Sequence, residues 1–206
     1  MPTLSYQHIF EPATDLSALP LLLLHGTGGD EHDLLPLARQ LSPGSVLLSP
    51  RGDVLERGAP RFFRRLAEGV FDLPDVEQRT HALADFIAAA AREYGFDGAR
   101  LTALGFSNGA NIAASLLLLR PESLAAAVLL RPMVVLEPAP AALPSLSGKR
   151  VLISSGEFDP IVPGDHPNRL AEMFRRAGAS VTLRTHPASH NLVPADLAVA
   201  KEFLSR

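Results

Sequence analysis

The chain has 206 residues, enough for one domain with a buried core and fewer than two domains of ordinary size need. Hydrophobic residues make up 47% and charged residues 20%, as in an average globular protein, which excludes disordered and fibrous classes. The formal net charge is −3, with acids and bases interspersed, so no positive field favours nucleic acid or an anionic membrane as a partner. We expect a single domain over residues 1–206 that acts on a small molecule.

The absence of cysteine excludes disulfides, thiolate metal sites and a cysteine nucleophile, and it agrees with a reducing compartment. The first residues, Met1–Phe10, lack the basic start of a signal peptide. The early apolar run Leu19–Leu24 is too short for a signal-peptide core or a membrane span. These features predict a cytoplasmic protein that is not bound to a membrane.

Short apolar runs alternate with amphipathic stretches along the chain, which is typical of parallel strands joined by crossover helices. Residues 3–11 are expected to form an antiparallel edge strand. Most of the later strand candidates are apolar on both faces, so we expect a mostly parallel α/β sheet covered by helices on both sides. Strands are expected at 21–24, 46–49, 101–106, 126–130, 151–155 and 181–185, and helices at 31–41, 77–94, 108–119, 167–177 and 195–204.

Two connections, 51–76 and 131–149, are longer than those that usually join elements of a compact domain. The first contains three phenylalanines among glycines and prolines, and the second contains four prolines. Because long loops in compact domains often carry function, both are expected to form pocket walls. The second is short for a lid domain, so an open, shallow site is predicted.

The pentapeptide Gly105-Phe106-Ser107-Asn108-Gly109 separates a predicted strand from a predicted helix and has the form G-x-S-x-G. A strand that turns abruptly into a helix strains the turn residue and pushes its side chain out above the sheet. Glycines two positions away on either side avoid collisions of a Cβ with the neighbouring strand or helix. Ser107 would also lie at a helix N-terminus, which favours developing negative charge. We therefore interpret Ser107 as a nucleophile.

A serine nucleophile needs a histidine that accepts its proton, and three histidines follow Ser107 in the chain. His166 lies beside a predicted helix start, where a capping or surface role is more common. His186 ends a strand and is an alternative base. His190 lies between the last predicted strand and the last predicted helix, where the base of such a fold projects. The sequence favours His190.

The acid that orients the histidine is expected between the serine and the histidine in chain order. Asp159 follows the strand at 151–155, and ligands of open parallel sheets lie beyond the carboxyl ends of the strands. Pro160 would stiffen its loop. Glu157 and Asp165 are nearby alternatives.

Acyl transfer also needs donors aimed at the tetrahedral oxyanion. The backbone N–H of Asn108 and that of Thr27, in the glycine-rich loop after the first buried strand, are the candidates. This loop does not fit the dinucleotide motif G-x-G-x-x-G, because its third position is Glu31 and Asp30 would repel a pyrophosphate. His25 is interpreted as a structural loop residue.

Four blocks resemble the phospholipase/carboxylesterase family of small α/β-hydrolases: residues 24–29, 105–110 and 159–163, and the segment around His190. Residues 50–52, 60–65 and 107–111 resemble the bacterial branch of hydroquinone-stress hydrolases more than the acyl-protein thioesterases. The resemblance implies an α/β-hydrolase fold without a substantial lid domain and a metal-free esterase. Its triad would be Ser107, Asp159 and His190, with an oxyanion hole at Thr27 and Asn108. Two positions differ: this chain has Asn108 where Gln is common, and Ser189 where the family usually has Gly.

The predicted function is hydrolysis of small carboxylic esters through an acyl-enzyme, with no cofactor. A thioesterase that acts on acyl-CoA or acylated protein remains an alternative, and a non-catalytic protein that binds a small ligand is a second one. A dienelactone hydrolase is disfavoured because its usual nucleophile is cysteine. Whether the protein forms a homodimer stays open.

The substrate contacts are expected among apolar residues in loops at the active end of the sheet, with core packing as the other interpretation. The arginines Arg61, Arg64 and Arg65 could bind a substrate carboxylate or phosphate, but a solvated helical face is favoured. The apolar candidates are Phe62, Phe63, Phe71, Met133, Ile161 and Leu192.

Overall fold

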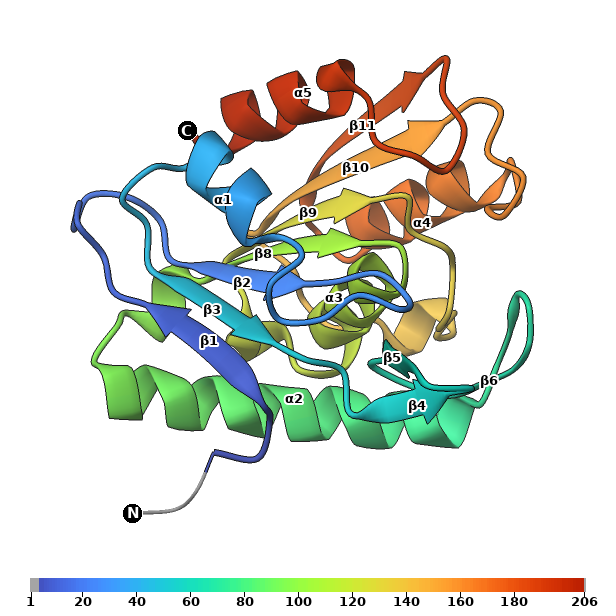
Figure 1. Cartoon of the computed structure of the whole chain (residues 1–206). Helices are drawn as coiled ribbons and strands as arrows, with labels where there is room; N and C mark the ends of the chain where they lie inside the picture. Colours follow the sequence, from blue (N-terminus) through green and yellow to red (C-terminus); the bar gives the residue numbers. More distant parts are fainter. Residues whose placement is uncertain (1–3, 206) are drawn as a thin grey trace.

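A seven-stranded sheet forms the centre of the molecule, in the order β1-β3-β2-β8-β9-β10-β11. The computed structural model describes residues 4–205. Only β1 runs antiparallel to its neighbour, with His8 opposite Pro50, and every other pairing is parallel. The predicted mostly parallel sheet is therefore confirmed (Figure 1). The strands are β1 (His8–Glu11), β2 (Leu21–Leu24), β3 (Leu47–Pro50), β8 (Thr102–Phe106), β9 (Ala126–Leu130), β10 (Arg150–Gly156) and β11 (Ser180–His186).

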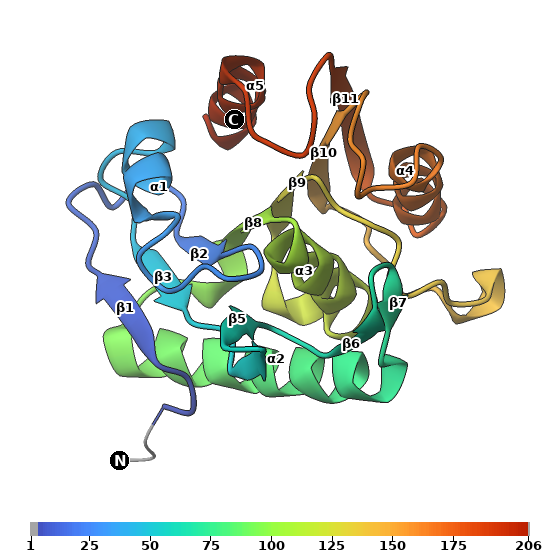
Figure 2. The same ribbon diagram turned by 45° about the vertical axis from the view of Figure 1, so that its right-hand side comes forward.

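Helices cover both faces of this sheet (Figure 2). On one face lie α2 (Leu73–Tyr94), α3 (Asn108–Leu119) and α4 (His166–Arg176). On the other face lie α1 (Leu35–Leu41) and α5 (Pro194–Leu204).

The strand β2 shows why the sheet needs two covers. Leu22 and Leu24 pack into the apolar cluster of α2, α3 and α4, whereas Leu21 and Leu23 pack into that of α1 and α5. All four leucines are fully buried, as a parallel strand between two helical layers requires.

Two helix starts differ from the prediction. Helix α1 begins at Leu35 instead of residue 31, because the preceding residues form tight turns in which the Asp33 and Leu35 N–H groups donate to Asp30 and His32 carbonyls. Helix α2 begins at Leu73 instead of residue 77, because the Asp72 carboxylate caps its first turn by accepting the Asp75 N–H at 3.3 Å. The first helical turn accommodates a proline, which has no N–H to satisfy.

The connection 51–76 is not an irregular loop but contains two small hairpins. Strand β4 (Val54–Glu56) pairs with β5 (Ala59–Arg61), and β6 (Arg65–Ala67) pairs with β7 (Val70–Phe71). The turn of the first hairpin has two residues with positive φ, at 51° for Arg57 and 86° for Gly58, which suits the twist of a two-residue hairpin.

The remaining expectations concern the N-terminal edge strand and the second long connection. The edge strand expected at residues 3–11 is present only over His8–Glu11, and residue 3 lies outside the described part. The connection 131–149 adds one short 3-10 turn, Pro140–Ala142, and no further layer. Within residues 4–205, no helix has the length and apolar character needed to cross a lipid bilayer.

Candidate active site

Ser107 stands on a strained turn between β8 and α3. Its φ of 52° and ψ of −113° are unusual for a residue with a side chain. The turn is held at both ends, because the Ser107 N–H donates to the Leu130 carbonyl at 2.8 Å and the Ser107 carbonyl accepts the Asn111 N–H at 2.9 Å. These two hydrogen bonds fix the backbone of Ser107, so its hydroxyl is held beyond the carboxyl end of the sheet.

The two glycines of the pentapeptide are required by close backbone contacts. A Cβ on Gly105 would lie 2.6 Å from the Gly109 carbonyl oxygen. A Cβ on Gly109 would lie 1.9 Å from the Leu24 carbonyl oxygen. Because backbone atoms cannot yield as a flexible side chain can, α3 can approach β8 and β2 this closely only with glycine at both positions.

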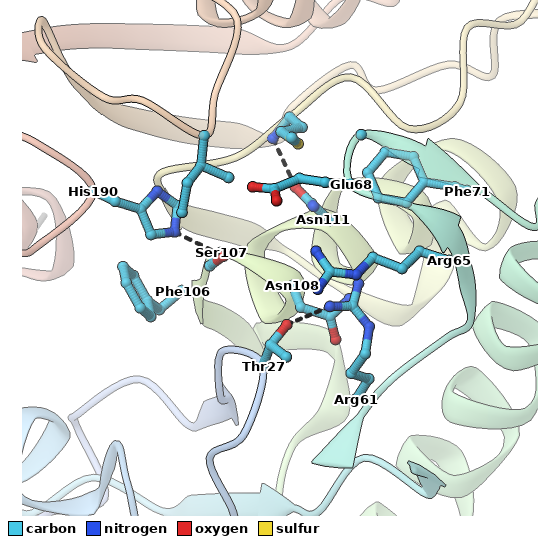
Figure 3. A pocket seen from close by; sticks show the side chains of 13 residues that line it. Thr27, Arg61, Arg65, Glu68, Phe71, Phe106, Ser107, Asn108, Asn111 and His190 are labelled. Atoms are coloured by element: carbon cyan, nitrogen blue, oxygen red, sulfur yellow. Dashed lines mark hydrogen bonds between the residues drawn. The ribbon is translucent and has the colours of Figure 1, made fainter. Parts of the chain in front are cut away.

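The structure brings Ser107, His190 and Asp159 into one chain of hydrogen bonds. Nε2 of His190 lies 2.9 Å from Oγ of Ser107, and Nδ1 of His190 lies 2.8 Å from Oδ2 of Asp159 (Figure 3 shows the Ser107–His190 pair). The other carboxylate oxygen of Asp159 accepts the N–H groups of Ile161 at 2.8 Å and Val162 at 3.1 Å. With its proton on Nδ1, His190 donates to the acid and presents a free Nε2 lone pair to the serine hydroxyl.

The alternative bases and acids do not take part in this hydrogen-bond chain. Nδ1 of His166 accepts the Val134 N–H, and burial lowers the pKa of His166. Nε2 of His186 lies 3.7 Å from the Asp196 carboxylate. Asp165 pairs with Arg169 on α4, and Glu157 has an exposed position.

The loop that carries His190 is held by a buried arginine that the sequence analysis did not identify. Arg131 donates from Nε to the Ser189 carbonyl at 3.0 Å and from Nη2 to the Asn191 carbonyl at 2.9 Å. Its guanidinium also forms two bonds of 2.8 Å with Asp196, and both side chains have an exposed fraction of 0%. Arg131 thus fixes the residues on both sides of His190.

Asp196 completes this cluster, because its carboxylate also accepts the Ser154 hydroxyl at 2.6 Å and the Val193 N–H at 2.8 Å. Burial alone would raise the pKa of Asp196, but these hydrogen bonds and the charge of Arg131 lower it below its ordinary value. A charged residue directly after a buried strand, as in Leu130-Arg131, is the signal that could have drawn attention to it.

Thr27 and Asn108, the predicted oxyanion-hole residues, line one cavity together with Ser107 and His190. Asn108 is the first residue of α3, where backbone N–H groups have no acceptor within the helix. The loop of Thr27 is fixed, because the Gly28 N–H donates to the Pro60 carbonyl at 3.0 Å.

His25 also holds the loop of Thr27 in place. Its ring is buried, and its Nε2 accepts the Gly52 N–H at 2.9 Å while Nδ1 lies 2.6 Å from the Gly26 carbonyl oxygen. Burial lowers the pKa of His25, so the neutral ring that these two bonds require is favoured.

The cavity has a volume of about 270 Å³ and lies at the carboxyl edge of the sheet. Phe71, Met133 and Ile161 line it, as expected. Three other expected contacts are wrong: Phe62 and Phe63 are fully buried in the core, and Leu192 packs on the α1 and α5 side. The full lining is Thr27, Arg61, Arg65, Glu68, Gly69, Phe71, Phe106, Ser107, Asn108, Asn111, Met133, Ile161 and His190.

The arginines at 61–65 do not form the solvated helical face that was favoured. Arg61 lies in β5 and is 3% exposed, and Arg65 lies in β6; both line the cavity (Figure 3). Arg64 points elsewhere and pairs with Asp72 at 2.8 Å. In the described part of the chain, no three His, Cys, Asp or Glu side chains lie close enough together to hold a metal ion.

Comparison with known proteins identifies the family of this chain. The family model described as Phospholipase/Carboxylesterase matches residues 71–206, more than half of the chain. The hydrolase MhqD of Bacillus subtilis is 44% identical over 197 residues, which cover 96% of each protein.

Solved structures agree with this assignment. The crystal structure of the Bacillus cereus carboxylesterase has a TM-score of 0.95 and 45% identity, over 98% of this chain and 95% of that one. A carboxylesterase from Mesorhizobium loti has a TM-score of 0.89 and 34% identity, over 100% of this chain and 97% of that one. The chain is therefore a serine hydrolase with the α/β-hydrolase fold that belongs to the phospholipase/carboxylesterase family.

Proposed function

We propose that the protein is a carboxylesterase that hydrolyses small carboxylic esters through an acyl-enzyme on Ser107. The observation that supports this most directly is the unbroken hydrogen-bond chain from the Ser107 hydroxyl through His190 to Asp159, with distances of 2.9 and 2.8 Å. Its serine end opens into the cavity, where an ester can reach it.

The first half of the reaction transfers the acyl group. Oγ of Ser107 attacks the ester carbonyl while Nε2 of His190 takes the hydroxyl proton, and Asp159 stabilises the resulting imidazolium. The backbone N–H groups of Thr27 and Asn108 donate to the oxyanion, with support from the N-terminus of α3. When the tetrahedral intermediate collapses, His190 gives its proton to the leaving alcohol and the acyl group stays on Ser107.

The second half repeats these steps with water. His190 removes a proton from a water molecule, the hydroxide oxygen attacks the acyl carbon, and the proton passes to Ser107 as the acid leaves. The cavity of about 270 Å³ is at the small end for a ligand site, so short acyl chains are favoured.

A fluorophosphonate probe tests the nucleophile. The wild-type protein is expected to be labelled, whereas Ser107→Ala should not be labelled and should lose about 10⁴- to 10⁶-fold in kcat. The matched control is Ser115→Ala on the same helix, whose hydroxyl donates to the Asn111 carbonyl and which does not line the cavity. It should keep both labelling and activity.

A series of p-nitrophenyl esters run beside acyl-CoA thioesters tests the substrate class. The highest kcat/KM is expected between acetate and hexanoate. A maximum at palmitate would contradict the small cavity, and a preference for acyl-CoA would make the protein a thioesterase. If the wild-type protein were neither labelled nor active on any ester, the proposal would be wrong.

A further inference from the structure

Two asparagine side chains in the cavity have fixed orientations. Oδ1 of Asn108 accepts the Phe62 N–H at 2.8 Å, and Oδ1 of Asn111 accepts the Met133 N–H at 2.7 Å. Because a backbone N–H must face the amide oxygen, the amino group is the end of each side chain that remains for other partners. Both residues line the cavity, and in each the amide oxygen is already occupied by a backbone N–H.

The amino group of Asn108 is an unusual donor. The residue is 2% exposed, and Nδ2 is buried without a hydrogen-bond partner in the described part of the chain. A buried donor without an acceptor loses its hydration and gains nothing in return. An acceptor atom on a bound ligand would satisfy it once the atoms that cover it shift aside.

Two guanidinium groups lie on the same wall and share one carboxylate. Arg65 forms hydrogen bonds of 2.9 Å and 3.0 Å with Glu56, and Nε of Arg61 lies 3.4 Å from the same carboxylate. Two positive charges facing one negative charge leave one unit uncompensated. Burial, as the largest cause, and the charge of Arg65 lower the pKa of Arg61, whereas Glu56 raises it.

A second acid, Glu68, also lines the cavity, but in the described part of the chain it is not paired with either arginine of this wall (Figure 3). Glu68 lies in the exposed turn between β6 and β7, and within residues 4–205 it forms no ion pair with Arg61 or Arg65. Thr27 is already committed, because its hydroxyl accepts a hydrogen bond from Arg61 at 2.5 Å.

Figure 3 shows the four donor side chains Arg61, Arg65, Asn108 and Asn111 around one cavity that also holds Ser107. An ionised carboxylate only accepts hydrogen bonds, carries the missing charge and matches the planar fork of a guanidinium. We propose that this donor wall binds a carboxylate of the substrate, so that the enzyme prefers esters with a second, free carboxylate close to the scissile bond. This inference rests on the proposed esterase function.

The carboxylate could belong to the acyl half or to the alcohol half of the ester, and two substrate pairs separate these cases. Monoethyl succinate is compared with ethyl 4-methylpentanoate, in which an isopropyl group replaces the acyl-side carboxylate. The acetate ester of glycolate is compared with isobutyl acetate for the alcohol side. In at least one pair, the wild-type kcat/KM should favour the anionic ester by roughly tenfold to a hundredfold, the usual range for charge-assisted hydrogen bonds.

Arg65→Met is expected to bring this preference down to within about threefold of unity, mainly through a higher KM for the anionic ester, whereas Arg65→Lys should keep part of it. Arg65 is partly exposed, so the variant should fold, which circular dichroism and the melting temperature would verify. The matched control is Arg64→Met, which removes a neighbouring exposed arginine outside the cavity and should leave the preference unchanged.

Binding without turnover gives a second readout. Succinate should raise the melting temperature of Ser107→Ala more than butyramide does, and Arg65→Met introduced into Ser107→Ala should remove the difference. Equal activity on both members of each pair in wild type and Arg65→Met would overturn the carboxylate site while leaving the esterase intact. If the wild-type protein neither hydrolysed any ester nor reacted with the fluorophosphonate probe, the esterase function itself would be refuted.

Discussion

Two arginine–carboxylate clusters flank the proposed catalytic residues, and they differ in how completely they are paired. In the first, Arg131 and Asp196 are both 0% exposed, and the guanidinium reaches a carboxylate and the carbonyls of Ser189, Asn191 and Ser154. In the second, Arg65 and Glu56 have exposed fractions of 27% and 33%. The same pair of chemical groups therefore holds a loop where it is fully buried, the closed cluster, and forms the proposed carboxylate site where it is partly exposed, the open cluster.

The first cluster offers the largest effect. Arg131→Met would leave the Asp196 charge buried without its cation, so the free energy of unfolding should fall by about 3–5 kcal/mol. For a chain of this size the melting temperature should fall by about 6 °C or more. Urea denaturation measures the change.

The matched control for this prediction is an exposed pair. Arg176 and Glu172 on α4 are 60% and 53% exposed, so Arg176→Met should change the free energy of unfolding by less than about 1 kcal/mol. Equal changes in both variants would refute the contrast between closed and open pairs. The double variant Arg131→Met/Asp196→Asn removes the unpaired charge and should regain part of the stability. Its kcat should stay up to about 100-fold low, because the Ser189 and Asn191 carbonyls are no longer held.

Low pH should have the next largest effect on stability, through the cluster of Arg131 and Asp196. The folded protein holds Asp196 ionised with a lowered pKa, so this stabilisation is complete above the ordinary aspartate pKa of about 3.9. It is lost as the pH falls from about 3.9 through the lower folded pKa, because over this range the unfolded state binds a proton that the folded state does not. Plots of unfolding free energy against pH should therefore slope less below pH 4 in the double variant than in wild type. Parallel slopes would contradict this role of Asp196.

The open cluster should give the smallest change in stability. Glu56→Gln breaks the pair with the partly exposed Arg65 and a longer contact of 3.4 Å with the buried Arg61. Because Arg61 keeps its hydrogen bonds to Thr27 and the Phe63 carbonyl, the free energy of unfolding should fall by about 1 kcal/mol or less. The variant also leaves two positive charges on the donor wall, so the KM for the preferred anionic ester should fall severalfold. A loss of stability as large as that of Arg131→Met would show that the open cluster is structural as well.

The sequence could predict those elements whose residues are all buried in the same kind of apolar surroundings. The buried strands were placed to within about one residue, because a parallel strand between helical layers is apolar on both faces, as Leu21–Leu24 is. Ser107, Asp159 and His190 could be predicted to lie close together because a sheet of this kind delivers the loops after β8, β10 and β11 to one edge, and in the structure their side chains meet there.

The elements that sequence could not predict depend on partners distant in the chain. The hairpins β4–β5 and β6–β7 have strands of two or three residues, too short for a detectable alternation. Phe62 and Phe63 were assigned to the pocket because an apolar residue in an irregular segment does not reveal which side it faces. The pair of Arg131 and Asp196 joins residues 65 positions apart, and no local pattern encodes such a contact.

The two hairpins have a consequence for how such an enzyme can diverge. They supply Arg61, Arg65 and Phe71 to the cavity, whereas Ser107 and His190 follow strands of the central sheet. In the esterase that we propose, exchanging a short surface segment would therefore alter which ester is accepted while Ser107 and His190 keep their places. Such a division of labour lets new preferences evolve without rebuilding the reaction centre.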